Sequence, residues 1–143
     1  MLQNRFKKIL VPLDGSPNSI RGLNEAISLA RQSQGTITGI YLIPGMSPRI
    51  AGLMKSYRVA LLKDAQKVMA RARDSAARHG IEFNEKIAAS IDVVKSISAF
   101  AKSMRFDVIV IGSRGTGSPD ARYLGSVSYG VVQESKVPVL IVK

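Results

Sequence analysis

The sequence predicts an α/β protein in which helices cover both faces of one parallel sheet, giving three layers. Three observations support this fold class. Short apolar segments alternate with segments of helical periodicity, so that five strands enclose four helices along the chain. The length of 143 residues suits one domain, 1–143, with a core of its own. Parallel strands joined by helices require right-handed crossovers, which place helices on both faces of the sheet.

The first strand and the first helix have clear sequence signals. Residues 7–14, KKILVPLD, form an apolar run with β-branched residues followed by turn chemistry, which predicts a buried strand. Ser16 can cap the following helix, with Pro17 at its first position. Apolar residues then recur at helical spacing, and we expect Gly35 to end the helix.

The second strand leads into a long basic helix. Residues 36–43, TITGIYLI, predict a strand that Pro44 ends. A loop through Pro48 then precedes a helix from about residue 50 to residue 79. Between positions 49 and 78 the chain has eight Lys or Arg and two Asp, so the net charge is +6. A solvated helix face accounts for such a charge, and an anion-binding surface is the alternative.

The third strand is expected at an edge of the sheet and the fourth at its centre. Residues 81–88, IEFNEKIA, alternate apolar and polar side chains, as in a strand with one exposed face. Ser90 can cap the next helix, whose apolar residues between 91 and 101 recur at helical spacing. Residues 106–112, FDVIVIG, are the most uniformly apolar strand.

The last part of the chain contains the most unusual stretch. Residues 111–128, IGSRGTGSPDARYLGSVS, follow the fourth strand and contain four of the twelve glycines. A helix over about 126–134 then leads to the last strand, VPVLIV at 137–142. A loop that only turns needs fewer glycines, so this stretch predicts close approach of a ligand to the main chain.

A binding site is expected at the carboxyl ends of the first and fourth strands, because ligands of open α/β sheets bind where the winding reverses. The first strand ends at Asp14. We expect Gly112 and Gly115 to take positive φ and to admit a ligand. Gly125 should leave the amides of the next residues exposed at a helix start, where phosphate is favoured. The Ser126 hydroxyl can cap that helix or bond the anion.

Two common phosphate motifs do not match. No glycine-rich turn ends in Gly-Lys followed by Ser or Thr after the first strand, so a P-loop is excluded. Gly115 and Gly117 are followed by Asp120 and lie after the fourth strand, which excludes the dinucleotide fingerprint.

The spacing that the chain does contain is Gly112, two residues, Gly115, nine residues, then Gly125 and Ser126. With ILVPLDGSPNS, DVIVIGSRG, LGSVS and VPVLIVK, it resembles the universal stress protein family in its ATP-binding branch. The resemblance implies a Rossmann-like fold of the adenine nucleotide alpha hydrolase type, with strand order 3-2-1-4-5. Strands one and four then lie side by side.

The resemblance also implies a set of ligand contacts between strands one and four. Asp14 should lie near adenosine, the Leu42 backbone near adenine, and Arg114, with Arg122, near phosphate. Asp120 lies where the family often has basic or apolar residues, and it would weaken triphosphate binding if it faced the site. The full set of expected ATP contacts is Pro12, Leu13, Asp14, Leu42, Ile111, Gly112, Arg114, Gly115, Gly125, Ser126, Val127 and Ser128. Asp14 has a second reading, in which it only satisfies the turn before the first helix.

Catalysis and metal binding have little support in the sequence. The single histidine, His79, lies at a predicted helix end, and no cluster of metal ligands or paired carboxylates is present. We therefore expect a nucleotide-binding protein that serves a stress response or regulation, and no enzyme beyond slow Mg²⁺-dependent ATP hydrolysis. ATP, with or without Mg²⁺, is the expected cofactor. We also expect it to order residues 44–60 over the base.

Bulk composition narrows the partners and the compartment. Zero cysteines suit a reducing cytoplasm, and no stretch approaches the roughly 20 apolar residues of a membrane span, so we expect no membrane partner. The net charge of +11 favours anionic partners. An apolar last strand at a sheet edge predicts a homodimer through residues 137–142. Two alternatives stay open: nucleic-acid binding by the helix over 50–79, and a family member that acts through protein contacts alone.

Overall fold

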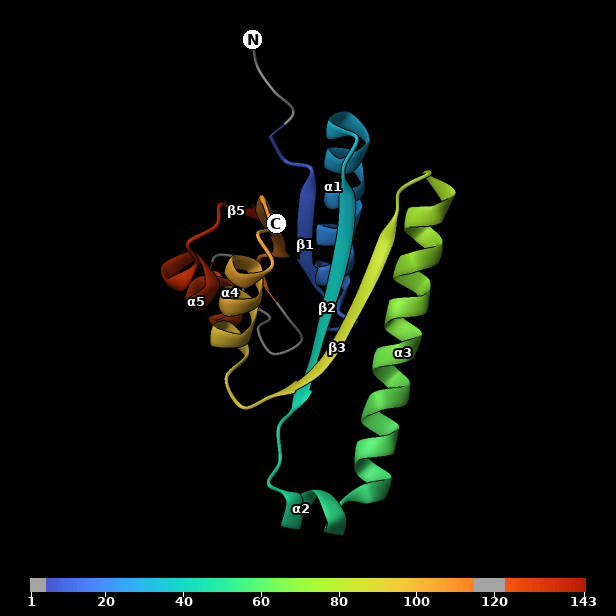
Figure 1. The fold of residues 1–143 in the computed structure, drawn as a ribbon, viewed down its shortest axis with the longest axis vertical. Coiled ribbons are helices and arrows are strands. Elements are labelled where there is room, and N and C mark those ends of the chain that lie inside the picture. The colour runs from blue at the N-terminus through green and yellow to red at the C-terminus, as the bar shows by residue number, and fades with distance from the viewer. Residues whose placement is uncertain (1–4, 115–122) are drawn as a thin grey trace.

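Five parallel strands form the centre of the molecule, a computed structural model that describes residues 5–114 and 123–143 (Figure 1). The strand order is β3-β2-β1-β4-β5, and every neighbouring pair is parallel. Both the parallel sheet and the expected order are therefore confirmed. The strands are β1 (Lys8–Pro12), β2 (Thr36–Pro44), β3 (Phe83–Ser90), β4 (Val108–Gly112) and β5 (Val139–Val142).

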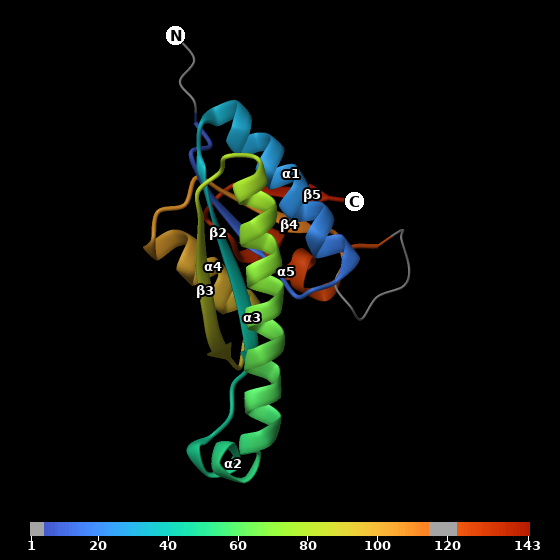
Figure 2. The same cartoon turned by 90° about the vertical axis from the view of Figure 1, so that its right-hand side faces the viewer.

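Helices lie on both faces of this sheet (Figure 2). Helices α1 (Pro17–Ser33) and α3 (Lys55–Arg78) pack on one face, and α4 (Val93–Ser103) and α5 (Ser126–Glu134) pack on the other. The short helix α2 (Pro48–Leu53) precedes α3 at one end of the molecule. The three expected layers are present.

Alternation along β1 divides the core between these two layers. Ile9 and Val11 face α1 and α3, whereas Leu10 faces α4, because successive side chains of a strand point to opposite faces. All five residues of β4 are buried, which confirms its central place. Strand β3 lies at the opposite edge from β5 and has no fully buried residue, as its alternating sequence predicts.

The prediction for the β3–α4 connection is wrong by a few residues. The strand covers Phe83–Ser90 instead of 81–88, so Ser90 ends the strand and does not cap the helix. The N-cap is Asp92, whose Oδ1 accepts from Lys95 N at 3.1 Å. Ser90 Oγ instead accepts from Asp92 N at 3.1 Å and orders the turn between the two elements.

The long helix predicted over 50–79 is divided in two, and it begins earlier. Ser47 caps α2 with Pro48 at its first turn, a position that suits proline because its missing N–H would have no helical partner. Met54 joins α2 to α3. At the end of α1, the left-handed C-cap is Gln34 instead of Gly35. Gly35 is required for another reason, because a Cβ there would lie 2.5 Å from Lys7 O.

Candidate functional site

A cavity of about 570 Å³ opens at the carboxyl ends of β1 and β4. Its walls come from both strands, from β2, and from the beginnings of α1, α4 and α5. Eleven of the twelve expected contact residues line it, and the twelfth, Gly115, lies outside the described residues. The eleven are Pro12, Leu13, Asp14, Leu42, Ile111, Gly112, Arg114, Gly125, Ser126, Val127 and Ser128.

Five further lining residues were missed by the sequence reasoning. They are Ser19, Ile40, Val93, Ile97 and Leu124. Ile40 could have been found, because it lies two positions before Leu42 and therefore on the same face of β2. Val93 and Ile97 occupy positions i and i+4 of α4, and their inclusion depends on where α4 packs. No local sequence signal gives that packing.

The half of the cavity formed by β2 and α4 is apolar. Ile40 and Ile97 are almost fully buried beneath it, and Leu42 and Val93 are partly buried around it. None of these side chains has a charge or a hydrogen-bonding group. This half suits a flat, weakly polar group such as a nucleobase, whose polar edge would have to be met by the backbone.

The opposite half is formed by the N-terminus of α5. Gly125 is its N-cap, with extended backbone angles and no side-chain cap. Of the two roles open to the Ser126 hydroxyl, helix capping is therefore excluded. The first helical hydrogen bond runs from Tyr129 N to Gly125 O at 2.9 Å. The amides of Ser126, Val127 and Ser128 therefore precede the helical ladder, at the positive end of the helix dipole.

Ser128 is one of the most buried polar residues of the molecule, and its hydroxyl is committed to the protein. Its Oγ donates to Ser113 O at 2.7 Å and lies 3.1 Å from Gly125 O. Ser113 O also accepts from Gly125 N at 2.7 Å. The end of β4 thus holds the first turn of α5, and Ser128 offers a ligand its amide and not its hydroxyl.

The reason for glycine at Gly112 differs from the expected one. Its φ is not positive, and within the described residues the glycines with positive φ are Gly15 and Gly80. A Cβ on Gly112 would lie 2.5 Å from Asn18 O. Glycine is therefore needed so that β4 can approach the backbone of α1, and Asn18 Nδ2 completes this contact with a 3.2 Å bond to Ser113 Oγ.

Asp14 has the expected turn role and also lies at the cavity. Its Oδ1 accepts from Ser16 N at 2.9 Å, which orders the turn before α1, and the residue also lines the cavity. Arg114 lines the cavity as well, so the described wall has one acidic and one basic side chain. Asp120 and Arg122 lie outside the described residues.

Asp14 also acts on Tyr41, a partly buried residue of β2. Burial raises the pKa of the Tyr41 hydroxyl, and the negative charges of Asp14 and Asp64 raise it further. The phenol therefore stays protonated in solutions where an exposed tyrosine begins to ionise.

Several other expectations can be compared with the structure. Residues 44–60 do not line the cavity, and much of this stretch is helical in α2 and α3. In residues 5–114 and 123–143 no group of three or more His, Cys, Asp or Glu is placed to hold a metal ion. Across the same residues, none of the helices is both long enough and apolar enough to cross a bilayer.

Known proteins of similar sequence and structure identify the family. The model of the universal stress protein family matches residues 5–143. The chain is 32% identical to Universal stress protein YxiE of Bacillus subtilis, over 96% of this chain and 99% of that protein. Its fold is similar to the universal stress protein UspA of Lactobacillus plantarum, with a TM-score of 0.88, 25% identity, and coverage of 97% and 99% of the two chains. It is also similar to a universal stress protein crystallised in complex with cAMP, with a TM-score of 0.77, 26% identity, and coverage of 97% and 98%. The chain belongs to the universal stress protein family.

Proposed function

We propose that this protein binds an adenine nucleotide, ATP in the first place, in the cavity between β1 and β4. It then acts as a nucleotide-dependent binding protein of a cytoplasmic stress response. The observation that carries the proposal is the composition of one cavity wall. The cavity has a volume of about 570 Å³. One half of its wall is apolar, and the other half contains a helix N-terminus without a side-chain cap. A nucleotide has the same division into base and phosphate.

Each half of the ligand has a matching partner. The base packs on Leu42 and Val93, and the Leu42 backbone meets its polar edge. The phosphate accepts hydrogen bonds from the amides of Ser126, Val127 and Ser128, where backbone donors and the helix dipole act together. Arg114 adds a positive charge. Hydrogen bonds to a charged group contribute about 1.5–3 kcal/mol each, so this half supplies much of the affinity.

A cyclic mononucleotide is the second candidate ligand. The similar universal stress protein in complex with cAMP favours it. The described wall has one acidic and one basic side chain, which suits a phosphodiester of single charge better than a triphosphate without a cation. With ATP, Mg²⁺ would be held mainly by phosphate oxygens, and Asp14 is the one carboxylate of the described wall.

We propose binding and not catalysis as the main activity. The described wall offers no histidine, and its carboxylate, Asp14, is already bonded to Ser16 N. General-base catalysis by this group would be weak, so any hydrolysis of ATP should be slow.

Calorimetry with ATP and cAMP tests the proposal, together with mass spectrometry of any co-purified small molecule. Gly125→Val places a branched side chain beside the α5 amides. The backbone angles at Gly125, φ −66° and ψ 163°, are allowed for any residue. Because Gly125 is buried, circular dichroism has to show that the variant is folded before its affinity is compared. We expect at least a tenfold loss of affinity. Gly52→Val in α2 is the control and should bind as the unaltered protein does. Equal binding by both variants would place the nucleotide elsewhere.

We also propose a homodimer formed through β5. This strand is at the edge of the sheet, and its Leu140 side chain is 43% exposed. Natural proteins usually cover such an apolar edge. Light scattering at micromolar concentration should give the mass of two chains, and a monomer at that concentration would contradict the proposal.

The two alternatives predict different responses to salt. A nucleic acid bound along the basic residues of α3 would be released steeply as salt rises, because phosphate-backbone binding depends on counterion release. A nucleotide held by backbone amides responds less. A protein that acts through protein contacts alone would show no heat of binding with any adenine nucleotide.

A further inference from the structure

The end of the molecule formed by α2 and the first turns of α3 has no core of its own. We call residues 46–63 the tip. In both views it extends beyond the end of the sheet (Figures 1 and 2). No residue from 44 to 64 is buried. Helices in proteins are usually stabilised by packing an apolar face, so a pair of helices without buried residues suggests that a surface outside this chain covers them.

Large apolar side chains are concentrated on this tip. Leu53 is 80% exposed, Tyr57 49% and Ile50 47%. Met54, Val59 and Leu62 are also exposed. Single exposed apolar residues are ordinary, but a group of this size within two helical segments marks an interaction site.

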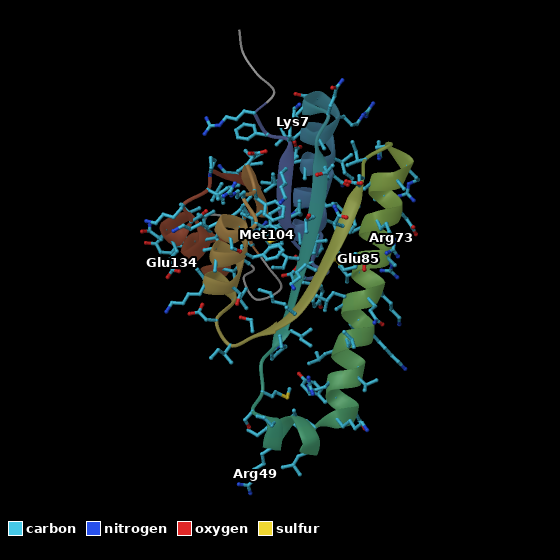
Figure 3. All side chains as sticks on the ribbon, viewed as in Figure 1. Lys7, Arg49, Arg73, Glu85, Met104 and Glu134 are labelled. Atoms are coloured by element: carbon cyan, nitrogen blue, oxygen red, sulfur yellow. The ribbon has the colours of Figure 1, made fainter. Side chains whose placement is uncertain are left out.

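The charge of the tip indicates the charge of its partner. It contains Arg49, Lys55, Arg58 and Lys63 and no Asp or Glu. Arg49 points away from the molecule at the far end (Figure 3). The chain as a whole has a net charge of +11, so the residues outside the tip have a net charge of +7. A second copy therefore also has a positive net charge, so the charge of the tip favours an anionic partner over a second copy.

The distribution of the apolar side chains selects the kind of anionic partner. Tyr57 and Val59 are two positions apart on α3, which places them about 200° apart around the helix. Both are exposed, so the apolar surface surrounds the helix and is not confined to one stripe. A rigid groove in a protein covers one stripe of a helix. A projecting tip with apolar side chains on opposite sides suits a deformable surface.

We propose that the tip binds an anionic lipid surface from outside, without spanning it. Leu53 and Tyr57 enter the headgroup region, and the four basic side chains stay at the level of the lipid phosphates. Binding to a bilayer interface is strengthened by buried apolar area and by the attraction of Lys and Arg to anionic lipids, and the tip offers both. The expectation of no membrane partner was based on the lack of a spanning stretch, which a peripheral contact does not need.

Sedimentation with vesicles tests this proposal on the full chain. Vesicles of phosphatidylcholine mixed with phosphatidylglycerol should bind the protein at least tenfold more tightly than vesicles of phosphatidylcholine alone. Leu53→Ser removes apolar surface without changing charge and should weaken binding about tenfold. Val132→Ser, at an exposed apolar residue of α5, is the matched control and should stay within about twofold.

Two results would overturn the proposal. One is equal or absent binding to both kinds of vesicle at low salt. The other is binding to anionic vesicles that Leu53→Ser leaves unchanged, because a site for phosphate groups alone does not depend on an apolar side chain. Because Leu53 is 80% exposed, the variant should keep its unfolding transition, which circular dichroism can check.

Discussion

The cavity and the tip both lie beyond the carboxyl ends of strands, yet they are held in opposite ways. At the cavity, β4 approaches α1 so closely that Gly112 has no room for a side chain, and Ser113 bonds α1 and α5. At the tip, a Cβ on Gly52 would have no atom within 4 Å. One region is positioned by long-range contacts, and the other by helix formation alone.

This difference teaches where substitutions should matter. Changes of a single atom at the cavity should alter folding and binding together, because the same hydrogen bonds support both. Changes at the tip should leave folding intact and act only on partners.

The largest expected effect is at Gly112. Gly112→Ala places a Cβ 2.5 Å from Asn18 O, and this backbone atom cannot move aside as a flexible side chain can. We expect the free energy of unfolding to fall by about 3 kcal/mol or more. Urea unfolding measures it.

The matched control at the tip is Gly52→Ala. Alanine favours a helix over glycine, so the free energy of unfolding should stay the same or rise by up to about 1 kcal/mol. A similar loss in both variants would show that the tip is packed as tightly as the cavity, and the contrast would fail.

The next effect is at Ser128. Ser128→Ala removes the hydroxyl that bonds Ser113 O and should lower the free energy of unfolding by about 1–2 kcal/mol. It should also weaken nucleotide binding about tenfold, because the first turn of α5 loses its link to β4. Calorimetry and urea unfolding measure the two effects.

Ser135→Ala is the control that separates the effect of Ser128 on the position of α5 from a general loss of stability. This hydroxyl donates to Val137 O at 2.6 Å, away from the cavity wall. The variant should lose a similar amount of stability and retain its nucleotide affinity. Parallel losses of affinity in both variants would mean that Ser128 acts through overall stability and not through α5.

A smaller effect is expected at high pH. Burial, then Asp14 and Asp64, raise the pKa of Tyr41 in the folded state. The stabilisation from this group is complete below the unfolded-state pKa of about 10 and is lost as pH rises through the folded pKa. Tyr41→Phe should therefore reduce the alkaline loss of stability, measured by urea unfolding over a pH series.

Two variants test whether the alkaline loss of stability comes from Tyr41. Asp14→Asn removes one of the negative charges, so tyrosinate absorbance assigned to Tyr41 should appear at lower pH than before. Tyr129→Phe changes an exposed tyrosine and should leave the alkaline loss in place. An identical pH series for Tyr41→Phe and the unaltered protein would contradict the burial of Tyr41.

The smallest effect concerns the ion pair between Arg73 of α3 and Glu85 of β3 (Figure 3). Both side chains are substantially exposed, and exposed pairs contribute little. Arg73→Met should change the free energy of unfolding by less than about 0.5 kcal/mol. A double-mutant cycle with Glu85→Gln measures the coupling, and a value above about 1 kcal/mol would show a pair shielded from water.

Much of the fold could be predicted because its signals are local. Ser16 caps α1 as expected, with its Oγ accepting from Ser19 N at 3.1 Å, and the uniformly apolar 108–112 is indeed buried. The errors occur where two local signals compete. Ser90 and Asp92 are both good caps, and the tertiary end of β3 decides between them. Pro48 suits a loop and a helix start equally well.

The site residues that have a local sequence signal could be predicted, but those that reach the cavity through long-range packing could not. The glycine spacing after β4 indicated the α5 amides, whereas Val93 and Ile97 enter the wall through the packing of α4. The glycine at 112 was correctly singled out for the wrong reason. The sequence around Gly112 gives no sign that Asn18 lies against it, because that contact joins residues far apart in the chain.

The central claim is that the first-turn amides of α5 bind the phosphate of an adenine nucleotide. Titration of ¹⁵N-labelled protein with ATP, followed by amide NMR shifts, tests it most directly. We predict saturable shifts at Ser126, Val127 and Ser128, absent or strongly weakened with adenosine. Shifts confined to the basic residues of α3, or equal α5 shifts with adenosine and ATP, would contradict the account.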